Sequence, residues 1–72
     1  MKYKVGDYVI LKDDLTFEKT QISSFIIDRM RGGIYQIDNL VYDRYYIIQH
    51  WVFREDNIQK QVNPEINPEY FL

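Results

Sequence analysis

Residues able to do acid–base chemistry are few and scattered in this sequence. The single histidine, His50, titrates near neutral pH and could act as a general base or a pH switch. No carboxylate or nucleophile stands at a recognised spacing from it, so a packed or exposed strand histidine is the favoured interpretation. The acidic pairs, Asp13 with Asp14 and Glu55 with Asp56, would have to converge across a pocket to hydrolyse a bond or hold magnesium. A solvated loop and the acidic start of a helical turn explain these pairs more simply.

Metal, cofactor and phosphate sites are also poorly provided for. The chain has no cysteine and one histidine, which excludes a thiolate zinc site and a histidine cluster within one chain. Gly32 and Gly33 lack the glycine spacing and the following helix of a phosphate cradle, so they predict a turn. We therefore expect a protein that is not an enzyme and that holds no metal and no cofactor.

Aromatic and arginine side chains offer a different chemistry, which is binding. Aromatic residues make up 17% of the chain, more than one small interior can hold. Tyrosine, tryptophan and arginine are also the types enriched at binding hot spots. An equally supported alternative is that the tyrosines simply cover a small fold with half-buried rings. The residues expected to bind a partner are Tyr35, Tyr45, Trp51, Phe53, Arg31, Arg54, Tyr70 and Phe71, with Arg29 and Arg44 as further polar contacts.

The elements that position these side chains are predicted to be strands of one small domain. The chain has 72 residues, a length that buries about 60% of the surface exposed when unfolded. Hydrophobic residues make up 46%, alanine is absent, and β-branched and aromatic types dominate, which favours strands. Strands are predicted at residues 8–11, 21–30, 34–38, 45–52 and 58–62, with a loop at 13–20, a hairpin turn at 31–33 and one helical turn at 53–57.

The apolar pattern also predicts which side chains fill the interior. Residues 21–30 are too densely apolar for a one-sided sheet, so we expect a strand buried on both faces. In residues 45–52, alternation places Tyr45 and Trp51 on one face and Ile48 and Val52 on the other. The expected interior is drawn from Val5, Val9, Leu11, Phe25, Ile27, Ile37, Ile48, Val52 and Ile58.

The opening Val5-Gly6-Asp7-Tyr8-Val9 resembles that of many SH3-like barrels. The glycine turn into residues 34–37 is similar to the third strand of such a barrel, and residues 51–58 to its closing strands and helical turn. The layout resembles small SH3-like proteins encoded by bacterial phages and plasmids. It implies a five-stranded barrel over residues 1–62, followed by a proline-containing extension at 63–72. The plasmid-borne dihydrofolate reductase of this fold is similar in outline, but residues 47–50 depart from its Val-Gln-Ile-Tyr run, so its activity is not carried over.

Three functions stay open. The leading hypothesis is a non-enzymatic module that binds a protein, such as a phage- or plasmid-type accessory or inhibitor protein acting on a host protein. A barrel that binds single-stranded nucleic acid has the aromatics it needs. However, nine basic against eleven acidic residues, a net charge of −2, supply no basic surplus. The third is an oligomeric reductase of the plasmid type. No apolar run approaches the roughly 18 residues of a membrane span and no signal-peptide pattern opens the chain, so a cytoplasmic location without membrane contact is expected.

The last ten residues combine two Asn-Pro steps with a terminal apolar triplet, Tyr70, Phe71 and Leu72. Chain ends of this polarity normally fray, but an exposed apolar triplet is unfavourable unless it docks. We expect the triplet to pack, with Glu65 and Glu69 facing water. Packing on the chain's own barrel and packing on a second chain, as in a homodimer, both remain open.

Overall fold

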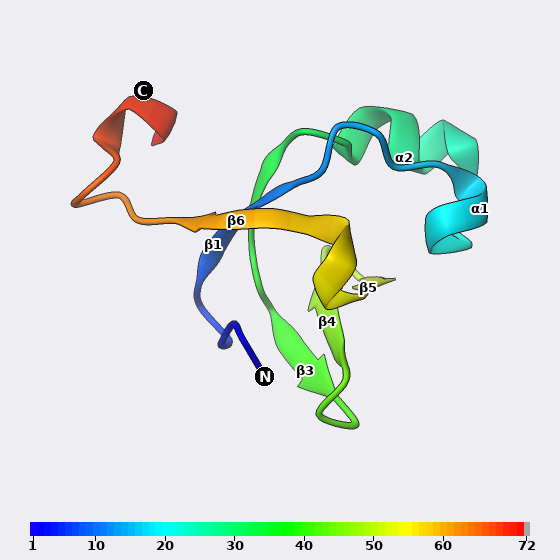
Figure 1. The fold of residues 1–72 in the computed structure, drawn as a ribbon, viewed down its shortest axis with the longest axis horizontal. Helices are drawn as coiled ribbons and strands as arrows, with labels where there is room; N and C mark the ends of the chain where they lie inside the picture. The colour runs from blue at the N-terminus through cyan, green and yellow to red at the C-terminus, as the bar shows by residue number, and fades with distance from the viewer. Residues whose placement is uncertain (72) are drawn as a thin grey trace.

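Two antiparallel sheets of three strands each make up most of the fold (Figure 1). The computed structural model describes residues 1–71. One sheet has the order β2-β1-β6 and the other β3-β4-β5. The strands are β1 Tyr8–Leu11, β2 Ile34–Gln36, β3 Asn39–Val41, β4 Tyr45–Ile48, β5 Trp51–Phe53 and β6 Ile58–Val62. The α-helices are α1 Phe17–Thr20 and α2 Ser24–Met30, and the 3-10 helices are η1 Glu55–Asn57 and η2 Pro68–Phe71. The prediction of a small, mostly β domain is therefore confirmed.

The chain crosses from one sheet to the other between β2 and β3. Only Ile37 and Asp38 separate these strands. The N–H of Ile37 donates to the carbonyl of Asp7 at 2.9 Å, beside the first sheet, and the N–H of Asp38 donates to the carbonyl of Ile47 at 2.8 Å, in the second. The predicted strand at 34–38 is thus in the right place, but β3 follows where only a turn was expected.

The segment predicted as the second strand, residues 21–30, is instead helical. Helix α2 turns Ile27 and Met30 into the core, while Phe25 is 66% exposed. The prediction was wrong because a short apolar run does not distinguish a two-faced strand from a short helix that is buried on one side. The predicted turn after it is present, but it leads from a helix to a strand. Gly32 there has φ +72°, a conformation that favours glycine.

The segment predicted as one long strand, residues 45–52, is a hairpin of β4 and β5. Gln49 and His50 form its two-residue turn with φ of 51° and 74°, and Ile48 lies opposite Trp51. Such turns normally carry asparagine or glycine, so these two residues gave no local signal. The predictions of β1, β6 and a helical turn between β5 and β6 are confirmed.

The core is formed by side chains of both sheets together with Ile27 and Met30 of α2. Six expected interior residues are buried: Val9, Leu11, Ile27, Ile37, Ile48 and Ile58. The other three, Val5, Phe25 and Val52, are exposed, because a turn, the outer face of α2 and the hairpin register direct them outward. Tyr46 is fully buried, and its hydroxyl accepts a hydrogen bond from the Tyr3 N–H at 3.1 Å, which satisfies the polar end of the ring.

The C-terminal segment returns to its own chain. The Phe71 ring meets the Tyr8 ring edge-on, and Lys60 Nζ donates to the Tyr70 hydroxyl at 3.1 Å. Glu65 and Glu69 are exposed, as predicted. Tyr70 and Phe71 thus contact their own chain, although 38% and 37% of their surface stays exposed, and Leu72 lies outside the described residues. In Figure 1 this segment leaves β6 at the end opposite α1 and α2.

Candidate functional site

Three of the expected binding residues line one hollow. Tyr45 from β4, Trp51 from β5 and Arg54, which precedes η1, border a cavity of about 620 Å³. Its other wall comes from α1 and the residues after it. The remaining lining residues are Glu18, Lys19, Thr20, Gln21, Ile22, His50, Val52 and Asn57. Segments 23 to 39 residues apart in the sequence therefore share this hollow.

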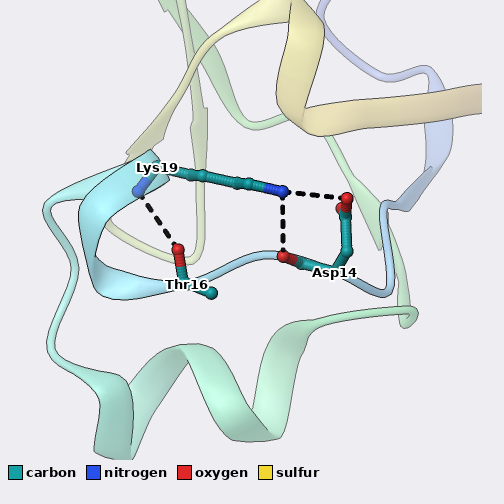
Figure 2. Close-up of polar contacts among 3 residues, drawn as sticks. All are labelled: Asp14, Thr16 and Lys19. Atoms are coloured by element: carbon teal, nitrogen blue, oxygen red, sulfur yellow. Dashed lines mark hydrogen bonds and ion pairs between the residues drawn. The ribbon is translucent and has the colours of Figure 1, made fainter.

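The α1 wall begins with a cap that the local sequence supplies. Thr16 precedes the helix in an extended conformation, and its Oγ1 accepts from the N–H of Lys19 at 3.3 Å. Lys19 also bends back, so that its Nζ lies 2.9 Å from Asp14 Oδ2 and 3.3 Å from the Asp14 carbonyl oxygen. Figure 2 shows these contacts closing residues 14–19 into a compact loop. The loop holds α1 in place although the helix has only four residues.

The end of α1 is anchored to the core. Gln21 adopts φ 60°, which ends the helix, and its N–H donates to the Phe17 carbonyl. The Thr20 hydroxyl donates to the Thr16 carbonyl at 2.8 Å and accepts from the Ile22 N–H at 3.1 Å. Ile22 itself is buried. The wall thus rests on an apolar anchor directly after its helical turn.

The facing wall is the β4–β5 hairpin. Its tight turn places Trp51, which is 37% exposed, and Val52, which is 47% exposed, beside the hollow. Asp38 Oδ2 accepts a hydrogen bond from the N–H of Gln49 at 2.8 Å and so holds the turn from the neighbouring strand segment. The indole and isopropyl groups of this wall are available for contact with a ligand.

Arg54 lies at the end of this wall, in a fixed backbone position. Its N–H donates to Asn57 Oδ1 at 2.9 Å, and its carbonyl accepts from the Asn57 N–H at 3.0 Å. Asn57 is the one buried polar residue of the described chain, and this bond satisfies its side-chain oxygen. Arg54 also borders two adjoining hollows, one beside Asp14 and one beside Arg44. Its guanidinium is therefore placed where three depressions of the surface meet.

Of the two cationic side chains that line the hollow, Lys19 is paired within the chain and Arg54 is not. A hydrogen bond and the positive charge from Lys19 hold the pKa of Asp14 below its ordinary value near 3.8. Lys19 is thereby engaged with a carboxylate of its own chain. The two ion pairs found among residues 1–71 are Lys19 with Asp14 and Arg31 with Asp28. Arg54 takes part in neither pair, so its charge can meet an acidic group of a ligand.

The other expected binding residues lie elsewhere. Phe53 is 0% exposed and belongs to the core, so its expected surface role is wrong; it faces Tyr46 across the β4–β5 pair. Tyr35 is half-buried against the core from β2. Arg31 follows α2 and is engaged with Asp28. Tyr70 and Phe71 pack on the β1–β6 side of the fold.

Several residues of the hollow were missed from the sequence. Val52 was expected inside and His50 was explained as an ordinary strand residue, because the hairpin turn between β4 and β5 was not recognised. Residues 18–22 were assigned to a loop and a strand. The available signal was Thr16, whose residue type favours the position directly before a helix, in an otherwise polar stretch.

The groups that line the hollow include an indole, a phenol, two aliphatic side chains and a guanidinium, which are suited to holding a chain segment. Within residues 1–71, no three histidine, aspartate or glutamate side chains gather as metal ligands. No helix of this part of the chain has the length and apolar character to cross a membrane. No protein-family model, curated protein or solved structure matches the chain.

Proposed function

We propose that this protein is a non-enzymatic binding module that holds a segment of a protein partner in the hollow between α1 and the β4–β5 hairpin. The observation that carries the proposal is the convergence of Tyr45, Trp51 and Arg54 on that hollow. Aromatic and arginine side chains clustered in a concave site are typical of binding hot spots. The volume of about 620 Å³ falls within the roughly 300–1,000 Å³ of ligand sites, which favours a short segment over a broad flat face.

The architecture proposed for the module is an SH3-like barrel over residues 1–62, with residues 63–72 as an extension. Three features support it: β1 pairs with both β2 and β6, the β2–β3 run joins the two sheets, and η1 separates β5 from β6. The resemblance of the layout to phage- and plasmid-borne barrels makes a host protein the proposed class of partner.

The charge distribution favours a protein segment over single-stranded nucleic acid. Glu18 lines the hollow itself, and Glu55 and Asp56 line a hollow that adjoins it at Arg54. These carboxylates would repel a phosphate backbone, whereas nucleic-acid sites are strongly basic. A peptide that carries one acidic side chain to meet Arg54 satisfies the same surface.

The test is selection of binders to the full chain from a displayed library of random peptides. Enriched peptides are then titrated against the wild-type protein, Trp51→Ala and the control Tyr42→Ala. Tyr42 is 88% exposed and outside the hollow, so its loss should leave affinity unchanged. We expect Trp51→Ala to weaken binding about thirtyfold or more, which corresponds to the roughly 2 kcal/mol or more that loss of a hot-spot residue costs.

Two results would contradict the proposal. One is the absence of any enriched peptide. The other is a labelled single-stranded oligonucleotide that binds, displaces the peptides and loses affinity steeply with added salt.

A further inference from the structure

Strand β5 has a neighbour on one side only. In the order β3-β4-β5 it pairs with β4 and forms the edge of its sheet. Trp51, Val52 and Phe53 make up the whole strand. An edge strand presents backbone donors and acceptors that can pair with another extended chain.

The register identifies Val52 as the residue whose backbone groups face outward. In an antiparallel pair, residues that exchange hydrogen bonds alternate with residues that do not. The two-residue turn at Gln49 and His50 closes on the hydrogen-bonded pair of Ile48 with Trp51, so the next pair, Ile47 with Val52, is not hydrogen-bonded. The N–H and C=O of Val52 therefore point away from β4. Among residues 1–71, no turn, loop or side-chain hydrogen bond involves them.

The hollow follows this open edge. Successive side chains of a strand point to opposite faces, so Trp51 shares a face with the buried Phe53 while Val52 lies on the other face. Both Trp51 and Val52 line the hollow. A depression that touches both faces of an edge strand must border its edge, and here its opposite side is closed by residues 18–22.

We propose that the partner segment binds as an added β-strand along β5, exchanging two backbone hydrogen bonds with Val52. This inference rests on the proposed function and specifies how the segment is held. Backbone pairing provides affinity, and alternate side chains provide specificity, as in other cases of strand addition. One set of side chains lies along Trp51, and the other meets Tyr45 and Arg54, where an acidic residue is preferred.

A single extended peptide fits this edge better than a second copy of the chain. The segment at residues 18–22 stands across from β5 and leaves a trough, whereas joining two sheets edge to edge needs open space for the partner's neighbouring strands. A stable dimer also buries about 800 Å² per partner. That area is roughly one sixth of the 5042 Å² surface of this protein, far more than a three-residue strand offers.

The test uses the full ¹⁵N-labelled chain and a peptide selected from the displayed library. We expect the amide of Val52 to exchange its hydrogen rapidly in the free chain and about tenfold or more slowly in the complex. Gln59 is the matched control, because the register break between Ile10 and Leu11 leaves it without a partner on β1. Its exchange should not change. Methylating the peptide amides one at a time should weaken binding at every second position.

Each result decides the inference. Protection of Val52 with a two-residue methylation period supports strand addition. An unprotected Val52, combined with loss of binding in Trp51→Ala, overturns strand addition and leaves the proposed function standing. If the Val52 amide is already protected without peptide, in a dimer that forms with rising concentration, the edge pairs with a second copy. That result overturns the inference. The absence of any selected peptide overturns both the inference and the proposed function.

Discussion

The carboxylate of Asp38 accepts a hydrogen bond from the backbone N–H of Gln49, with Oδ2 and N 2.8 Å apart. Asp38 lies between β2 and β3, and Gln49 begins the turn that joins β4 to β5. A side chain at the junction of the two sheets thus restrains a hairpin turn whose residues, Gln49 and His50, have unfavourable positive φ angles. This hairpin turn positions Trp51 at the hollow.

Replacing Asp38 with alanine should therefore reduce both stability and binding. The loss of one net hydrogen bond predicts a decrease of about 0.5–1.5 kcal/mol in the free energy of unfolding. Peptide affinity should fall as well, because the hairpin wall becomes less well ordered. Urea denaturation and peptide titration measure the two effects. Asp38→Asn is the control: it keeps an acceptor oxygen and should lose less of both, and equal losses in the two variants would contradict this role.

Phe53 and Trp51, two positions apart on β5, should respond oppositely to truncation. Phe53 is fully buried, so Phe53→Ala is expected to cost about 3–5 kcal/mol and to unfold so small a domain. Trp51→Ala should lower the melting temperature far less while weakening peptide binding strongly. Thermal denaturation followed by circular dichroism distinguishes them. A collapse of Trp51→Ala comparable with that of Phe53→Ala would make Trp51 a core residue and not part of a binding surface.

Removal of residues 63–72 should destabilise a monomer. The truncation deletes the edge-on contact of Phe71 with Tyr8, whose ring centroids are 5.1 Å apart, and the contact of Tyr70 with Lys60. An aromatic pair contributes about 0.5–1.5 kcal/mol beyond its buried area, so a loss of that order is expected. Ile66→Ala serves as a control because Ile66 is exposed. A change in oligomeric state on truncation, measured by analytical ultracentrifugation, would instead indicate packing between chains.

The Asp14 carboxyl should titrate below its ordinary value near 3.8, because Lys19 donates to it and sits beside it. A lowered pKa in the folded chain means that the ionised carboxylate stabilises folding. This contribution is fully present above about pH 3.8 and is lost as the pH falls through the folded-state pKa. Carboxyl NMR titration measures it directly. Lys19→Met should raise the pKa of Asp14, and the remote Lys4→Met should leave it unchanged; an unchanged pKa in Lys19→Met would contradict the assigned cause.

Several elements were predictable because their signals are local. Strand β1 is apolar and β-branched, strand β6 begins and ends on a β-branched residue, and the acidic turn η1 follows directly from its own residues. The packing of Tyr70 and Phe71 was predictable for a similar reason, since exposed apolar rings at a chain end are unfavourable in water. For the candidate site, residue type alone selected Tyr45, Trp51 and Arg54, which the structure brings to one hollow.

Two of the wrong elements have long-range causes. Residues 24–30 form a helix because only one side of the segment, with Ile27 and Met30, faces the core. A run of apolar residues does not show whether one side or both sides of a segment are buried. The hairpin turn at Gln49 and His50 carries no glycine or asparagine. It is restrained by Asp38, eleven residues away, which no local pattern reveals.

The amino-acid sequence by itself determined the β-rich class, the missing thiolate chemistry and the set of aromatic and arginine residues from which a binding surface could be built. Only the tertiary structure decided which of them meet. Register does this for β5, since the two-residue turn places Trp51 on the face of Ile48 and Val52 on the opposite face, the reverse of what one continuous strand would give. The tertiary structure also brings residues 18–22 across from β5. That proximity comes from packing between distant segments and not from any preference of the residues themselves.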